Sequence, residues 1–250
     1  MPDIVTTLRA AGCVFAEDEA RLLTEAATDP DELAALVERR VAGIPLEQLL
    51  GWAEFGGLRI VVEPGVFVPR RRTELLVREA AARRPRTVVE LCCGSGAIAA
   101  ALIDLLDSPD VYAADIDPAA VRCTRRNLPD AHVYEGDLAA PLPLRLVGAV
   151  DVLVANAPYV PTAEIALMPP EARDHEPRVA LDGGADGLDL ARRVMAAAPR
   201  WLAPAGVVIV ETSGRQAPLL AAAATAAGLV PHVVDDEDTG GTAVVAGRPD

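Results

Sequence analysis

From residue 87 onward, short apolar runs typical of buried strands alternate with longer segments of helical periodicity. Strands are predicted over residues 87–91, 111–116, 131–135, 150–155, 207–211, 229–234 and 242–246. Helices are predicted between them, from a glycine-rich turn to residue 106 and over 118–127, 187–202 and 215–227. Apolar strands that alternate with helices indicate a parallel sheet covered on both faces. A short loop joins the last two strands, which predicts an antiparallel pair there.

Before residue 87 the pattern differs. Helical periodicity covers 16–27 and 31–42, and two apolar runs then flank Gly56-Gly57, which predicts a β-hairpin. A helix is predicted over 72–84, whereas the stretch 157–186 is rich in Pro and Gly and is predicted to be irregular. We therefore predict an α/β protein in three parts: a helical module over 1–45, a β-hairpin linker over 46–70 and an α/β domain over 71–250.

Composition narrows the class of protein. Of the 250 residues 51% are hydrophobic, which excludes a disordered chain, and the apolar runs are shorter than the roughly 18 residues of a membrane span. The start Met1-Pro2-Asp3 has neither a basic segment nor a long apolar run. No export signal and no membrane association are therefore expected, and the protein is predicted to be cytoplasmic.

The charge is strongly acidic. Twenty-three basic residues, all of them Arg, stand against 37 acidic ones, which gives a net charge of −14. Phosphate backbones repel such a chain, so stable nucleic-acid binding is not expected. A small molecule or a basic protein partner is compatible with this charge, and so is an acidic surface that serves only solubility.

Nothing in the sequence predicts a metal site. The four cysteines and three histidines have no zinc-ligand spacing. With no export signal, the cysteines are expected to be reduced thiols.

A glycine-rich turn stands where the strand over 87–91 gives way to a helix. It contains Glu90, Gly94, Ser95 and Gly96, and with Ala99 it fits the loose pattern Gly-x-Gly-x-x-Ala of dinucleotide-binding turns. Glycines there let a ligand approach the backbone, next to the free N–H groups of a helix N-terminus. A plain tight turn would have the same sequence features.

Two acidic residues follow the next two strands. Asp115 lies about 20 residues beyond the glycines, where a carboxylate accepts hydrogen bonds from ribose hydroxyls. Asp137 follows the third strand, where a side chain can contact an adenine edge. Either residue could instead be a solvated loop Asp. Together with the glycines they predict a nucleoside cofactor, but they do not separate NAD from S-adenosylmethionine.

The fourth strand ends in Asn156-Ala157-Pro158-Tyr159, at a position that faces the ligand crevice of doubly wound sheets. A neutral amide, a rigid proline and an aromatic ring suit recognition of a planar NH2 group. The segment has no acid, base or thiol nucleophile. Taken alone, it also fits an ordinary strand end followed by a proline turn.

The segment 156–159 resembles the Asn-Pro-Pro-Tyr motif of amino-group methyltransferases that use S-adenosylmethionine. The chain as a whole resembles the protein N(5)-glutamine methyltransferases that modify peptide chain release factors, the HemK/PrmC family. The matching segments are 67–74, 90–98, 115–118, 136–138, 156–161, 175–178, 180–184, 186–187 and Glu211.

The resemblance implies a class I methyltransferase fold, a Rossmann-like sheet of seven strands whose last pair is antiparallel. It also implies that the glycine turn holds the methionine end of S-adenosylmethionine, Asp115 its ribose and Asp137-Leu138 its adenine. The cofactor-binding residues expected on this basis are Phe67, Pro69, Arg70, Glu90, Cys92, Cys93, Gly94, Ser95, Gly96, Asp115, Ile116, Asp137, Leu138 and Asn156.

For the reaction, the resemblance implies that Asn156 and the next backbone carbonyl hold the amide of a glutamine in a protein, a release factor or a related target. The helical module would dock that protein. The expected catalytic segment is Asn156, Ala157, Pro158 and Tyr159. Two fixed acceptors can turn the weakly nucleophilic amide nitrogen toward the methyl group and stabilise the charge that grows on it. Tyr159 can stack on the amide plane.

Three features depart from the family. Ala157 replaces the first proline of the motif, which keeps the carbonyl but loosens the loop. The helical module is short, and the segment 240–244 lacks the Arg that usually follows its glycine. Three alternatives therefore stay open: methylation of another amine in a small molecule or nucleobase, an oxidoreductase with a nucleotide cofactor, and a binding module without activity.

Overall fold

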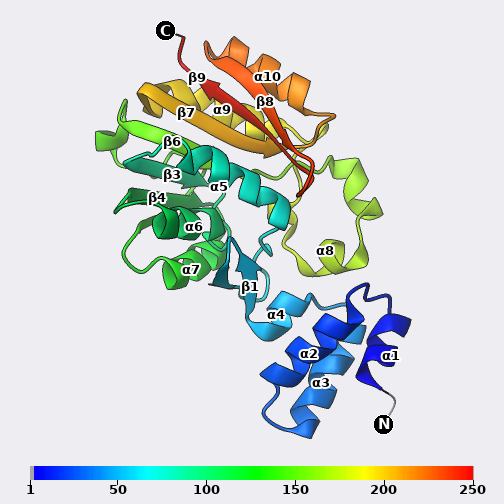
Figure 1. The fold of residues 1–250 in the computed structure, drawn as a ribbon. Helices are drawn as coiled ribbons and strands as arrows, with labels where there is room; N and C mark the ends of the chain where they lie inside the picture. The colour runs from blue at the N-terminus through cyan, green and yellow to red at the C-terminus, as the bar shows by residue number, and fades with distance from the viewer. Residues whose placement is uncertain (1–2, 250) are drawn as a thin grey trace.

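The computed structural model describes residues 3–249, which form a seven-stranded sheet between helices and a group of helices at the N-terminal end (Figure 1). The strands run in the order β5-β4-β3-β6-β7-β9-β8. Their bounds are Thr87–Leu91 for β3, Asp110–Asp115 for β4, His132–Glu135 for β5, Val150–Ala155 for β6, Leu202–Thr212 for β7, Val230–Asp236 for β8 and Gly241–Gly247 for β9. The first five strands of this order are parallel, and β9 is antiparallel to β7 and β8. The predicted parallel sheet with an antiparallel end is confirmed.

Two apolar layers enclose the sheet. Val88 and Val152 belong to the layer under α5 and α6, whereas Val89 and Leu153 belong to the layer under α9 and α10. All four side chains are fully buried. Burial on both faces explains why the strands are apolar throughout. The helices of the sheet body are α5 (Glu74–Ala81), α6 (Ala97–Leu105), α7 (Pro118–Asn127), α9 (Asp189–Trp201) and α10 (Ala217–Ala226).

Helix α5 is shorter than the helix predicted over 72–84. Residues Arg71–Thr73 form a separate 3-10 turn, η1, and α5 ends at Ala81. The early end has a local cause, because Pro85 disfavours the helical conformation at Arg84, whose φ is +48°. Within residues 3–249 no helix is long and apolar enough to cross a membrane.

The helical module has a small core of its own. Helices α1 (Ile4–Ala10), α2 (Ala16–Ala26) and α3 (Pro30–Val41) pack around a cluster that includes Leu8, Leu23 and Leu36. Helix α4 (Leu46–Leu50) joins this cluster, although the sequence places its residues in the hairpin linker. The boundary at residue 45 stays a prediction, and the packing groups α4 with the helices before it.

The predicted hairpin forms between β1 (Trp52–Phe55) and β2 (Leu58–Val61). Phe55 and Ile60 are buried in the apolar layer under α5 and α6. The side-chain amide of Asn127 in α7 donates to the Val61 carbonyl at 2.9 Å and accepts from the Val61 N–H at 2.8 Å. The hairpin is therefore fixed to the sheet body.

The stretch predicted to be irregular contains three short helices: η3 (Thr162–Leu167), α8 (Pro170–His175) and η4 (Arg178–Ala180). Helix α8 lies between the sheet body and the helical module (Figure 1). Arg40 of α3 reaches Glu171 of α8 at 3.1 Å and also binds Glu19 of α2 at 2.6 Å. Gln48 of α4 donates to the carbonyl of His175 at 3.3 Å. These contacts connect the module to the segment that leads into the site.

Candidate active site

The carboxyl ends of the parallel strands bring the predicted polar residues to one edge of the sheet. In strand order, this edge carries Asp137 after β5, Asp115 at the end of β4, the glycine turn after β3, Asn156 after β6 and Glu211 near the end of β7. The direction of chain order reverses between β3 and β6, which is where sheets of this kind bind ligands. The glycine turn and Asn156 flank this reversal point.

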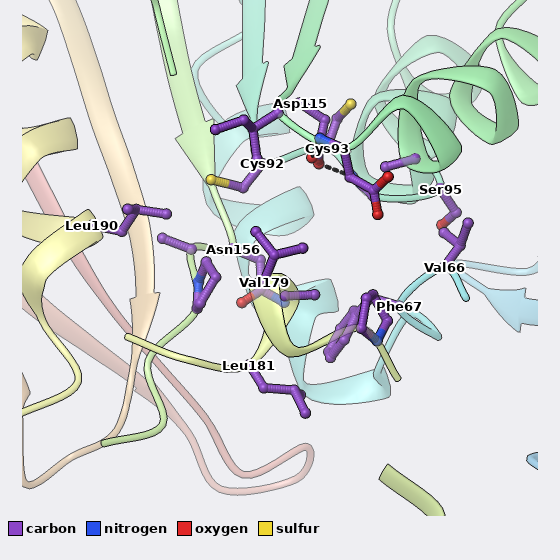
Figure 2. Close-up of a pocket in the computed structure, with 18 of the residues that line it drawn as sticks. Val66, Phe67, Cys92, Cys93, Ser95, Asp115, Asn156, Val179, Leu181 and Leu190 are labelled. Carbon is purple, nitrogen blue, oxygen red and sulfur yellow. Dashed lines mark hydrogen bonds between the residues drawn. The ribbon is translucent and has the colours of Figure 1, made fainter. Parts of the chain in front are cut away.

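A cavity of about 320 Å³ opens at this edge (Figure 2). Figure 2 shows Asn156, Cys92 and Asp115 around one space, with Phe67 on the opposite side. The segment 66–73, which we call the strap, forms part of the wall. The predicted site residues that line the cavity are Phe67, Pro69, Arg70, Glu90, Cys92, Cys93, Gly94, Ser95, Asp115, Ile116, Asp137, Leu138, Asn156, Ala157, Pro158 and Tyr159. Gly96 is the one member of the predicted set outside this lining.

Gly94 and Gly96 serve different purposes. Both have the left-handed φ that favours glycine, +56° and +75° respectively. A Cβ on Gly94 would meet nothing within 4 Å, so this part of the turn is open to a ligand. A Cβ on Gly96 would lie 2.9 Å from Thr124 Cγ2 of α7. Gly96 therefore allows the start of α6 to pack against α7, which explains why it is not part of the cavity wall.

Asp115 orders the glycine turn and keeps acceptor capacity for a ligand. Its Oδ2 accepts from the Gly94 N–H and its Oδ1 from the Asp117 N–H, both at 2.9 Å. Burial raises the pKa of this carboxyl, and the two backbone N–H groups oppose that shift. A carboxylate has about four acceptor positions, so about two remain for the hydroxyls of a ribose.

Glu90 places a second carboxyl at the same end of the cavity. Its side chain is buried, and its Oε2 accepts from the Ala99 N–H at 2.9 Å. Burial, helped by the nearby charge of Asp115, raises the pKa of Glu90 to about 8. A cationic group bound beside Glu90 would favour its ionised form.

The end of β5 supplies a partly apolar wall. Asp137 lines the cavity, and its Oδ2 accepts from Arg193 of α9 at 2.6 Å. This ion pair ties α9 to the β5 end. Leu190 lies one turn before Arg193 and lines the cavity with Ile116 and Leu138. This wall suits a flat ring with polar edges, and the contact of Asp137 with such a ring stays a prediction.

The strap is held to the crevice by Glu176, just beyond α8. Its Oε1 accepts from the Val68 N–H at 3.2 Å and from Arg70 at 2.7 Å. Burial raises the pKa of Glu176, and the Arg70 charge opposes that shift. The Arg70 guanidinium also lies 5.1 Å from the centre of the Phe67 ring. These contacts fix two predicted cofactor residues, Phe67 and Arg70, in the cavity wall.

Thr73, the last residue of η1, contacts Asn156. Its Oγ1 accepts from Asn156 Nδ2 at 3.2 Å, and Thr73 is only 3% exposed. With the NH2 end of the amide bound to Thr73, Oδ1 is the end left for another donor. This geometry matches the acceptor role expected of Asn156.

Tyr159 is anchored at its hydroxyl. The hydroxyl donates to Glu211 Oε1 at 3.1 Å, and Arg72 Nε donates to the same oxygen at 3.2 Å. Burial and the Glu211 charge raise the pKa of Tyr159, so it stays protonated. The Arg72 guanidinium lies 5.7 Å from the centre of the Tyr159 ring. These contacts hold the ring in a fixed orientation at the cavity wall.

The cysteines of the turn are not activated. Burial raises the pKa of both Cys92 and Cys93, so their thiols stay protonated. Cys93 Sγ lies 3.3 Å from Thr124 Oγ1, a packing contact with α7. Among residues 3–249, no group of three or more His, Cys, Asp or Glu is placed to hold a metal ion.

Sequence reasoning missed several residues of the site, among them Thr73, Glu176, Arg193 and Gln216. Thr73 and Glu176 lie in segments that match the family, but their partners are 83 and 106 residues away. Arg193 is one of several arginines on α9, and no spacing marks it. Gln216 lies directly before α10, and the carbonyls that it binds are 57 and 30 residues away in the chain.

Comparison with known proteins adds the family. The methyltransferase small domain family matches residues 57–168. The release factor glutamine methyltransferase of Geobacter sulfurreducens is 39% identical over 88% of this chain and 80% of its own length. That of Streptomyces coelicolor is 45% identical over 73% of this chain and 69% of its own length. The chain belongs to the release factor glutamine methyltransferase family.

Solved structures agree with this membership at the level of the fold. A methyltransferase from Pyrococcus furiosus superposes with a TM-score of 0.57 at 16% identity, over 76% of this chain and 88% of that one. The ribosomal protein L11 methylase of Lactobacillus delbrueckii gives a TM-score of 0.55 at 18% identity, over 76% and 86%. The predicted class I methyltransferase fold of this release factor glutamine methyltransferase family member is therefore confirmed.

Proposed function

We propose that the protein transfers the methyl group of S-adenosylmethionine to the side-chain amide nitrogen of a glutamine in a peptide chain release factor. One observation carries the proposal: the Asn156 amide is held by Thr73 in the wall of the cavity that the glycine turn also lines. Family membership supports the choice of substrate and disfavours the alternatives of another amine, an oxidoreductase or an inactive module.

The cavity wall fits the nucleoside part of the cofactor. Asp115 would accept from the ribose hydroxyls, because about half of its acceptor positions are free of backbone partners. Ile116, Leu138 and Leu190 would contact the adenine ring, and Ile116 is 54% exposed and so available for a ligand to cover.

The methionine part fits the side of the cavity between the glycine turn and the strap. The open side of Gly94 admits a ligand to the turn, Glu90 offers a carboxyl to an ammonium group, and Arg70 offers a cation to a carboxylate. Glu176 lines the same cavity, and its buried Oε2 has no hydrogen-bond partner among residues 3–249. This oxygen is therefore a free acceptor for the ammonium group. Bound in this way, S-adenosylmethionine supplies an electrophilic methyl group on a positively charged sulfur.

The reaction loop, residues 156–159, would orient the substrate. An amide nitrogen is a weak nucleophile because its lone pair is delocalised into the carbonyl. Asn156 Oδ1 and the Ala157 carbonyl would each accept one N–H of the glutamine amide and turn its nitrogen toward the cofactor. The same oxygens stabilise positive charge as it grows on nitrogen, and the proton leaves to water after the transfer.

Ala157 is compatible with this role. Only its carbonyl is used, and the residue is 1% exposed, so its methyl group is packed. The loop is held by contacts on either side: Asn156 by Thr73, and Tyr159 by Glu211. The loss of one proline therefore need not release the loop.

We propose that the helical module docks the release factor. The module contacts α8 through Arg40–Glu171 and Gln48–His175, and α8 leads directly to Glu176 in the cavity wall. A protein bound on the module would therefore lie close to the site. Removing residues 1–45 would delete Arg40 and the helices on which α4 packs, so point changes on the exposed surface of the module are the better test.

The test is methyl transfer from radiolabelled S-adenosylmethionine to purified, unmethylated release factor. We expect label in the release factor, and none when its target glutamine is replaced by alanine. The Asn156→Ala enzyme is the matched control for contaminating activity. A wild-type enzyme that binds the cofactor but labels no release factor would overturn the proposal.

A further inference from the structure

Gln216, at the start of α10, makes hydrogen bonds that reach the reaction loop. Its Nε2 donates to the Tyr159 carbonyl and to the Asp186 carbonyl, both at 2.9 Å. Its Oε1 accepts from Ser213 Oγ at 2.6 Å. Gln216 is only 4% exposed. The side chain at the start of α10 thus connects two other segments of the chain, the reaction loop and the segment that contains Asp186.

The chemistry of these contacts requires an amide. A glutamine NH2 has two N–H donors, and here each meets a backbone carbonyl. The Ser213 hydroxyl donates to the remaining oxygen, and exchanging the two ends of the amide would lose both bonds to the backbone carbonyls. A carboxylate at this position would bring its oxygens against two carbonyls.

The close packing of Gln216 against the reaction loop also requires a residue without a side chain at position 187. A Cβ on Gly187 would lie 2.4 Å from Gln216 Nε2 and 2.3 Å from the Tyr159 carbonyl oxygen. Glycine at 187 therefore lets the segment 181–187, the reaction loop and Gln216 come together. The segment 181–187 also binds Val160, the residue after the reaction loop. The Gly183 N–H donates to the Val160 carbonyl at 2.9 Å, and the Val160 N–H donates to the Leu181 carbonyl at 3.1 Å.

We infer that Gln216 is a positioning residue that holds the reaction loop in its catalytic shape through the Tyr159 carbonyl, and that it supplies rigidity which Ala157 does not. The inference rests on the proposed function. Tyr159 lies three residues after Asn156, so fixing its carbonyl limits how far the Asn156 and Ala157 acceptors move. A proline at 157 would restrict the same loop from within, because its ring fixes φ.

The Gln216 bond to the Tyr159 carbonyl and a proline at position 157 would each restrict the reaction loop. The effects of changing these two residues on kcat should therefore depend on each other. Gln216→Met keeps the approximate side-chain volume and removes both donors. We expect its kcat with release factor to fall by at least about tenfold, with the Kd for S-adenosylmethionine changed by less than about threefold. Adding Ala157→Pro should restore several-fold of the lost kcat in Gln216→Met and change wild-type kcat by less than about twofold.

Two further variants keep the test decisive. Ser213→Ala leaves Gln216 in place but removes the bond that orients it, so we expect a smaller kcat loss, which also serves if Gln216→Met is poorly folded. Thr225→Val, which removes a side-chain bond to the Ala221 carbonyl on the same helix, should leave kcat unchanged. Circular dichroism and thermal melting show which variants are folded.

The outcomes separate this inference from the proposed function. No labelling of release factor by the wild-type enzyme contradicts the proposed function. With an active wild type, a kcat within threefold of wild type for folded Gln216→Met would overturn the inference. Equal effects of Ala157→Pro in both backgrounds would also overturn it, because Gln216 and residue 157 would then act independently.

Discussion

Replacing Thr73 by valine tests how the catalytic amide is oriented. The two side chains have nearly the same shape, so Thr73→Val removes the acceptor at 3.2 Å from Asn156 Nδ2 with little change in packing. A net hydrogen bond contributes about 0.5–1.5 kcal/mol, and a buried donor left unpaired costs about 1–3 kcal/mol. Since the amide can turn to recover part of this loss, we expect the barrier to methyl transfer to rise by about 1–2 kcal/mol. This corresponds to a rate about 5–30-fold lower.

The assay is single-turnover transfer from labelled S-adenosylmethionine to release factor at saturating cofactor, so that binding and product release do not mask the chemical step. Thr73→Ser keeps the hydroxyl and should stay close to wild type. Thr212→Val is the matched control, because Thr212 Oγ1 is buried near the same edge and has no partner among residues 3–249. A Thr73→Val rate within twofold of wild type, or a Thr73→Ser enzyme as slow as Thr73→Val, would refute the orienting role.

Three further changes probe the rest of the site. Asn156→Ala should lower kcat by about 10²–10³-fold while the enzyme stays folded, measured by the same single-turnover assay, and a loss below about threefold would contradict the mechanism. Asp115→Ala should weaken S-adenosylmethionine binding at least about tenfold, because the ribose loses a charged acceptor, and unchanged affinity by calorimetry would remove Asp115 from the site. Burial raises the pKa of Glu90 to about 8, so its contribution to the unfolding free energy is fully present at low pH and is lost as pH rises toward 8. Glu90→Gln should therefore flatten the pH dependence of urea unfolding by about 1.4 kcal/mol per pH unit between pH 5.5 and 7.5, and identical slopes for the two proteins would refute this.

Local signals in the sequence located most of the sheet and its helices. Strand β6 and helix α7 have the predicted bounds, residues 150–155 and 118–127. In α7 the signal is physical: Pro118 opens the helix, and the Asp117 side chain accepts from the Ala119 N–H at 2.8 Å. Helix α4 was missed because its five residues owe their shape to packing on the helical module, which no local pattern reveals.

The residues of the site also fall into a predictable and an unpredictable group. Groups placed at strand ends could be predicted, since parallel strands bring their carboxyl ends to one edge, and Asp115 and Asn156 both line the cavity. The groups that orient them could not. Thr73 reaches Asn156 across 83 residues, and Gln216 reaches Tyr159 across 57. Such pairings depend on how the strap and α10 pack against the sheet, and a single sequence does not specify that packing.

Asp137 shows a further limit of prediction from the sequence: the partner of its side chain. The sequence placed it correctly after β5 but could not anticipate that Arg193 of α9 would bind its carboxylate. Its position was predictable from strand order, whereas its partner came from a helix 56 residues further along the chain. A predicted binding residue can thus reach the cavity wall with its side chain already engaged by the fold.

The central claim is that this site methylates the amide nitrogen of one glutamine in a release factor. It is tested most directly by mass spectrometry of release factor treated with S-adenosylmethionine and either the wild-type or the Asn156→Ala enzyme. We expect a single added methyl group, mapped by fragmentation to a glutamine side-chain nitrogen, with the wild-type enzyme and at most a trace with Asn156→Ala. A methyl group on a different residue type, or equal methylation by both enzymes, would contradict it.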